Sequence, residues 1–139
     1  MKTSQPTLKP LFTADTAIAK IQAIQDLWNS RDASKMVTTF DGEAKVFNRG
    51  NLIEGCSSIQ SFLELRFNKA LHCTMTIDLW TFSDFRISAS FLSEWQDAIR
   101  GQWYRSEGNM QMCFNEQGLI EKLSVSAFDA RIQADEREI

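Results

Sequence analysis

The sequence predicts an α+β fold in which a curved antiparallel sheet wraps around three helices to form a cone with a cavity. Apolar residues recur at helical spacing in the first half of the 139-residue chain, and they alternate with period two from Thr74 onward. Helices and strands that are segregated along a chain are typical of α+β domains. A chain of this length fits one domain of ordinary size, so we expect one sheet to cover all three helices.

Three helical segments are expected before the long strands begin. The first starts at Thr13, a favourable N-cap, and ends near 29–30. The second is shorter and is capped by Asp32. The third opens at 55–58 and ends around Ala70. Their apolar positions are Ala17, Ile21, Ile24 and Trp28 in the first, Met36, Val37 and Phe40 in the second, and Ile59, Phe62, Leu63 and Phe67 in the third.

The strands are expected in two groups. After a turn at Asp41-Gly42, the short strands 44–47 and 51–54 flank a turn at Asn48-Arg49-Gly50. Four long strands then form an antiparallel meander. They begin at Thr74 and continue as 85–95, 102–114 and 119–128. We divide the chain into an N-terminal arm (1–11), the cone domain (12–131) and a charged tail (132–139), with 130–139 expected as a frayed helix.

Both faces of the sheet are expected to carry apolar side chains. Trp80 has the opposite parity to Met75, Ile77 and Leu79, so the first long strand is apolar on two sides. Helices cover one of these faces. A second copy of the chain is the simplest cover for the other, and the sequence therefore predicts a homodimer formed through the sheet.

The composition excludes several classes of protein. The 15 basic and 18 acidic residues give a formal net charge of -3, which argues against a nucleic-acid partner. No apolar stretch is long enough to cross a membrane, and no secretory signal is expected at the N-terminus. Cys56, Cys73 and Cys113 are distant from one another, which favours reduced thiols and a cytoplasmic location. With one histidine and no phosphate-binding or dinucleotide-binding motif, we expect no metal and no cofactor.

Several short strings of this sequence occur together in a known order. They are Thr13–Ala17, Trp28–Asp32, Asn48-Arg49, Leu79–Phe82, Glu94-Trp95, Gly101–Ser106 and Gly108-Asn109. As a set, spanning about residues 11 to 131, they resemble an uncharacterised family of the nuclear-transport-factor-2-like, or SnoaL-like, superfamily. The resemblance implies the α+β cone and a homodimer through the sheet. The superfamily includes ketosteroid isomerase, scytalone dehydratase, limonene epoxide hydrolase and polyketide cyclases, and also non-catalytic binding and assembly domains, so the fold does not settle the function.

The chain departs from the usual pattern of that family at three places. Val46–Arg49 stands where the family usually has Trp-Arg-Asn-Arg. Gly108–Phe114 stands where it has Gly-Asn-Glu-Asn-Trp-Glu-Phe, and Ser126–Asp129 stands where it has Ser-Ile-Asn-Asp. The changes run toward apolar residues, which is compatible with a polar pocket that has been retuned or lost.

The candidate polar site combines two arginines with two acids. Arg105, Glu107 and Asn109 alternate along one strand and so share one face. If that face lines the cavity, these side chains and Arg49 bind an oxygen of the ligand, and Glu107 or Asp129, with a raised pKa, takes a proton. The alternative is a set of cross-strand ion pairs on a solvated or dimer-forming face.

The remaining candidates for ligand binding are mostly aromatic. One polar candidate is Asn48. The aromatic candidates either line a pocket for a flat apolar ligand or belong to the ordinary core, and they are Trp28, Phe40, Phe67, Trp80, Trp95 and Trp103. The leading hypothesis is a small-molecule-binding domain that can carry out cofactor-free proton transfer, such as isomerisation, dehydration or cyclisation, on an apolar carbonyl compound. The alternatives are a non-catalytic carrier or sensor and a dimeric protein-interaction scaffold.

Overall fold

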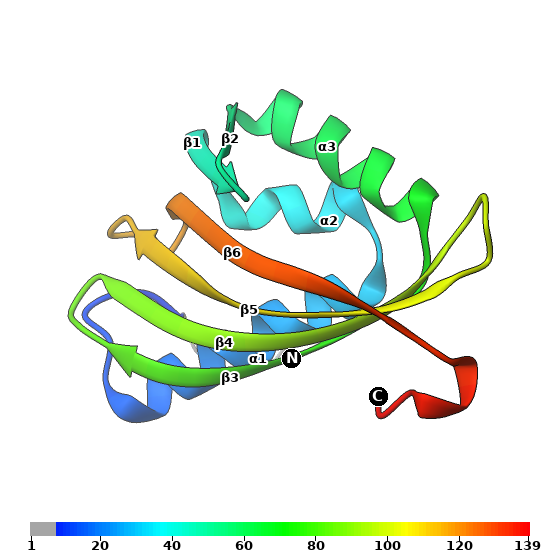
Figure 1. Cartoon of the computed structure of the whole chain (residues 1–139). Helices are drawn as coiled ribbons and strands as arrows, with labels where there is room; N and C mark the ends of the chain where they lie inside the picture. The colour runs from blue at the N-terminus through cyan, green and yellow to red at the C-terminus, as the bar shows by residue number, and fades with distance from the viewer. Residues whose placement is uncertain (1–7) are drawn as a thin grey trace, which may run out of the picture.

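Figure 1 shows the computed structural model, which describes residues 8–139 as a curved sheet with helices against it. The helices are α1 (Ala14–Ser30), α2 (Ala33–Met36) and α3 (Cys56–Lys69), with short 3-10 turns η1 (Val37–Thr39) and η2 (Ala134–Glu136). The strands are β1 (Phe40–Asn48), β2 (Asn51–Glu54), β3 (Ala70–Phe82), β4 (Arg86–Asp97), β5 (Trp103–Phe114) and β6 (Ile120–Ile132). The expected α+β cone is confirmed.

The first two helices begin where their capping residues predicted. The Thr13 side chain accepts a hydrogen bond from the backbone of Thr16, whose own side chain accepts one from the Thr13 backbone. At the other end of α1, Arg31 adopts a left-handed conformation and donates its N–H to Trp28. Asp32 then caps α2 through the N–H groups of the next turn. Local signals in the sequence are therefore sufficient for these boundaries.

The sheet has the strand order β2-β1-β6-β5-β4-β3. The predicted antiparallel meander of β3 to β6 is confirmed, and so is the antiparallel pairing of β1 with β2. The pairing of β1 with β6 is parallel and was not anticipated. It joins the short hairpin to the long strands, so that the β1–β2 turn lies beside the middle of β6.

Three local predictions were wrong. Phe40 does not belong to a helix but begins β1, where it pairs with Ile120. Asp41-Gly42 is not a turn between elements but part of β1, at a register shift between Phe40 and Lys45. Residues 130–139 are not a helix, because 130–132 continue β6 against β5 and only one 3-10 turn follows.

The sheet presents one face to the helices, here called the inner face. On β5 the inner face carries Ser106, Met110 and Met112, while Arg105, Glu107 and Asn109 have the opposite parity and lie on the outer face. The buried core lies between the inner face and the helices, and it includes Ile21, Ile24, Met36, Phe40, Ile59, Leu63, Met75, Ile77, Ile87 and Leu123. Polar residues therefore alternate with core residues along the same strand.

The chain end docks on the outer face of the sheet. Glu94 of β4 is fully buried, and its carboxylate accepts the backbone N–H groups of Glu138 and Ile139. Arg105 donates from Nε to the same carboxylate at 2.9 Å and from Nη2 to the Glu136 carbonyl at 2.7 Å. Burial raises the pKa of Glu94, but these hydrogen bonds outweigh burial and the net shift is downward.

The expected arm is described only in part. Residues 1–7 lie outside the described residues. The backbone of Leu8 and Lys9 packs closely on Gly118, which has a φ of +82°. No helix among residues 8–139 is both long and apolar enough to span a bilayer.

Candidate functional site

A cavity of about 230 Å³ lies between the helices and the inner face of the sheet. Its apolar wall comes from α1, α3 and four strands. Its polar lining residues are Asn48, Arg49, Arg66, Lys69, Cys73, Ser93 and Ser106. Its apolar lining residues are Trp28, Phe62, Leu65, Phe67, Met75, Phe91, Met110 and Val125. A mostly apolar pocket with a few convergent polar groups is the usual form of a small-molecule site.

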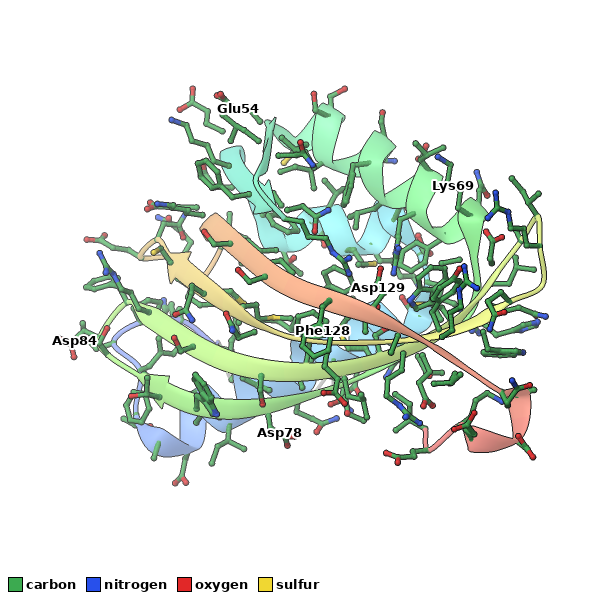
Figure 2. The ribbon with its side chains drawn as sticks, viewed as in Figure 1. Glu54, Lys69, Asp78, Asp84, Phe128 and Asp129 are labelled. Carbon is green, nitrogen blue, oxygen red and sulfur yellow. The ribbon has the colours of Figure 1, made fainter. Side chains whose placement is uncertain are left out.

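The centre of the polar wall is an ion pair that joins the β1–β2 turn to strand β6. Arg49 donates from Nη1 and Nη2 to the two oxygens of Asp129, at 2.9 and 2.8 Å. Ser106 donates to Asp129 Oδ1 at 2.5 Å, and Trp95 donates from Nε1 to Ser106 at 3.0 Å. Figure 2 shows Asp129 and Phe128 on opposite sides of β6, with Asp129 toward α3. The β1–β2 turn and the strands β4, β5 and β6 thus hold one carboxylate in a fixed position.

The turn that carries Arg49 is shaped to present it. Arg49 has a φ of +52° and Gly50 a φ of +87°, the pattern of a tight two-residue hairpin. The backbone N–H of Arg49 donates to the Val125 carbonyl at 3.0 Å, which fixes the turn against β6. A left-handed conformation costs a non-glycine residue about 1–2 kcal/mol. The bidentate bond to Asp129 and the bond to Val125 offset this cost.

The environment of Asp129 keeps it ionised. Hydrogen bonds from Arg49 hold the pKa of Asp129 below its usual value, the bond from Ser106 acts in the same direction, and partial burial opposes both. The sequence predicted a raised pKa for Glu107 or Asp129, and for Asp129 the pKa is lowered instead. A carboxylate whose two oxygens both accept from an arginine is stabilised in its charged form.

Arg66 is the second guanidinium at the cavity. It comes from the last part of α3, and its Cζ lies 4.7 Å from the centre of the Trp95 ring. Trp95 in turn stacks on Tyr104, with ring centres 4.6 Å apart. Within residues 8–139, no carboxylate lies within the 4.0 Å of an ion pair with Arg66. Burial lowers the pKa of Arg66, although an arginine stays protonated near neutral pH.

Several predicted residues do meet at the cavity. Trp28, Asn48, Arg49 and Phe67 line it. Asp129 lies directly behind Arg49 and Ser106, and Trp95 lies behind Ser106 and Arg66.

Other predicted residues lie elsewhere. Arg105, Glu107 and Asn109 are on the outer face, where Arg105 pairs with Glu94, so the expectation that they line the cavity was wrong. The physical reason is that side chains alternate between the two faces along β5. Met110 and Met112 are apolar and turn toward the helices, so the three polar residues at the alternate positions face outward. Trp80 is exposed on the outer face, Phe40 is in the core, and Trp103 packs under Arg137.

Two important residues were not singled out from the sequence. Arg66 follows Phe62 by four residues and Leu63 by three, so it falls on the apolar stripe of α3, and an arginine there is a signal that could have been noticed. Ser106 shares the parity of Met110 and Met112. Among residues 8–139, no three histidine, cysteine, aspartate or glutamate side chains are grouped as metal ligands.

The architecture is that of nuclear-transport-factor-2-like proteins. SalBIII, an epoxide hydrolase/cyclase-like enzyme of salinomycin pyran ring formation, superposes with a TM-score of 0.73 at 12% identity, covering 82% of this chain and 92% of SalBIII. An NTF2-like protein of unknown function from Exiguobacterium sp. 255-15 gives 0.70 at 16% identity, covering 80% and 99%. RV0760c from Mycobacterium tuberculosis, in complex with estradiol-17beta-hemisuccinate, gives 0.68 at 14% identity, covering 78% and 91%. These similarities establish the fold.

Within that class, the family is given by the sequence itself. The protein-family model described as "Protein of unknown function (DUF1348)" matches residues 10–139, so the chain belongs to this family. Comparison with curated proteins gives no match.

Proposed function

We propose that this protein binds a small apolar carbonyl compound in the cavity between α3 and the inner face of the sheet. The observation that carries the proposal is the combination of an apolar lining with one fixed polar wall around Arg49. The apolar body of the ligand packs on Trp28 and Phe67, and its oxygen accepts hydrogen bonds from the polar wall. Binding of apolar ligands by proteins of this fold, such as the estradiol-17beta-hemisuccinate complex of RV0760c, supports the proposal.

The size of the cavity limits the ligand. A cavity of 150 Å³ accommodates benzene, so one of about 230 Å³ suits a compound of roughly nine or ten non-hydrogen atoms. Leu65 and Lys69 line the cavity and are exposed, so the entrance lies beside the C-terminal half of α3. Acetophenone is therefore a suitable probe, because it is an apolar carbonyl compound of this size.

The test is an NMR titration with acetophenone. The backbone signals of cavity residues should shift in the wild-type protein, and Val125→Phe, which fills the cavity from β6, should abolish the shifts. Ser124→Phe is the matched control, because this neighbouring residue of the same strand has the opposite parity and lies on the outer face. Shifts that survive in Val125→Phe, or that never occur in the wild type, would refute the proposal.

Proton transfer is the second candidate function. It is favoured by the position of the Asp129 carboxylate, which contacts two residues of the cavity wall. In this reaction an α-proton of the carbonyl compound moves to Asp129, and the resulting enolate oxygen is stabilised by the arginines before reprotonation. The lowered pKa makes Asp129 a weak base, which is why binding is the first candidate.

Deuterium uptake distinguishes the two functions. If Asp129 is a base, the methyl group of acetophenone should exchange with D₂O faster with the wild-type protein than with Asp129→Asn. Equal exchange in both, at saturating probe, would leave binding as the function and exclude Asp129 as the base.

We also propose that the outer face forms a homodimer interface. Trp80 and Phe128 are 69% and 65% exposed there, and they line an open groove with Leu92. In a two-fold dimer each copy contributes the same pair of aromatic side chains, and burial of these rings dominates such an interface. Phe128→Glu should give a monomer by analytical ultracentrifugation, whereas Ile99→Glu, at an exposed apolar residue of the β4–β5 turn, should not.

A further inference from the structure

The charges around the cavity do not balance. Arg49 is paired with Asp129, and this pair is neutral. Arg66 has no carboxylate partner among residues 8–139, and Lys69 adds a second positive charge at the entrance. The cavity therefore has a net positive wall that is partly shielded from water.

Arg66 is also held in place before any ligand arrives. Its guanidinium lies on the indole of Trp95, which is fixed by its hydrogen bond to Ser106 and by stacking on Tyr104. This cation–π contact uses none of the guanidinium N–H groups as hydrogen-bond donors, so they are free to donate to a ligand. A preoriented fork of donors matches the two oxygens of a carboxylate.

Burial of a cation without an anion is unfavourable, and an anionic ligand removes that cost. Arg49 is already paired with Asp129, and Lys69 is an exposed point charge at the entrance, so Arg66 is the one lining residue among residues 8–139 that offers an unpaired guanidinium fork, which suits a single carboxylate. We propose that the ligand is a small monocarboxylate, of the aryl-alkanoate or branched aliphatic acid class, whose carboxylate binds Arg66. This inference rests on the proposed function in that the same cavity is the ligand site, and it assigns to that site a carboxylate in place of a neutral carbonyl group.

The test compares phenylacetate with phenylacetamide by isothermal titration calorimetry at pH 7. The two probes have the same ten non-hydrogen atoms and differ in charge. Phenylacetate should bind the wild-type protein about tenfold or more tightly, because hydrogen bonds to charged groups are the stronger kind. Arg66→Gln should reduce the ratio of the phenylacetate affinity to the phenylacetamide affinity to about one, and it should leave the affinity for phenylacetamide nearly unchanged.

Two further variants separate a specific site from general charge. Arg66→Lys keeps the charge but loses the planar fork, and it should retain only part of the preference. Lys69→Gln removes a neighbouring positive charge at the entrance, and this variant should keep most of the preference for phenylacetate. If Arg66 only stabilises Trp95, then Arg66→Gln lowers the melting temperature and leaves the preference intact, which overturns the proposal.

The outcomes distinguish this inference from the proposed function. If acetophenone binds and phenylacetate shows no preference over phenylacetamide, the monocarboxylate assignment is wrong and the cavity function stands. If none of the three probes binds the wild-type protein, both proposals fail. If phenylacetate binds but the preference persists in Arg66→Gln, the cavity function stands and Arg66 is not the anion site.

Discussion

Substitution of Asp129 by asparagine should weaken both the fold and the polar wall of the cavity. The wild-type carboxylate accepts two hydrogen bonds from Arg49 and one from Ser106, all between 2.5 and 2.9 Å. The side chains of Arg49 and Asp129 are 35% and 31% exposed, so solvent screens their attraction. Exposed pairs contribute about 0.2–1 kcal/mol, and a bidentate geometry lies at the upper end of that range.

The expected loss for Asp129→Asn is about 1–2 kcal/mol. About 1 kcal/mol comes from the ion pair, and the remainder comes from the weaker bond that Ser106 makes to a neutral acceptor. Urea unfolding at pH 7 measures the loss directly. A double-mutant cycle with Arg49→Met isolates the pair, and we expect a coupling energy of about 1 kcal/mol. Glu54→Gln, at an exposed carboxylate of β2, is the matched control and should change stability by less than about 0.5 kcal/mol.

The pH dependence provides an independent check. The pKa of Asp129 is lowered in the folded protein, so its contribution to stability is complete above the unfolded pKa, near 3.8, and is lost as pH falls through the lowered folded value. The difference between wild type and Asp129→Asn should therefore shrink in acid. A coupling energy below about 0.3 kcal/mol, or a difference that is unchanged in acid, would refute the reasoning.

Two further predictions concern the sheet. Gly108→Ala should destabilise the protein by about 2–4 kcal/mol in urea unfolding, because a Cβ there would overlap the Ser126 carbonyl and force β5 from β6. The control Gly42→Ala has nothing within 4 Å and should change stability little, and similar values for the two would contradict this. The lowered pKa of Glu94 means that its bonds to the chain end persist at neutral pH and break as pH falls below that pKa. The amide NMR signal of Ile139 should move in acid in the wild type but not in Glu94→Gln, and a wild-type signal that stays constant would disprove the coupling.

The helices and the long strands could be predicted because their signals are local. Thr13 and Asp32 are capping residues, and the caps act within one turn of the helix they start. The alternation from Thr74 onward likewise depends only on neighbouring residues. The parallel pairing of β1 with β6 could not be predicted in this way, because it joins segments about eighty residues apart and is stabilised by the completed sheet.

The candidate site was harder to predict, and β5 shows why. Arg105, Glu107 and Asn109 attracted attention because charged residues at one parity suggest chemistry. The competing rule, that the apolar parity faces the core, assigned Met110 and Met112 to the inner face and brought Ser106 there with them. Asp129 has the parity of Leu123 and Val125, so the same rule places it on the inner face, but its contacts with Arg49 and Ser106 depend on the pairing of β6 with β1 and β5, which no local pattern in the sequence encodes.

The two arginines of the cavity have different electrostatic roles. Arg49 and Asp129 satisfy one another, so their contribution to a ligand is a fixed shape and a few remaining donors. Among residues 8–139, Arg66 contacts Trp95 but pairs with no carboxylate, so a ligand that brings its own carboxylate gains the most there.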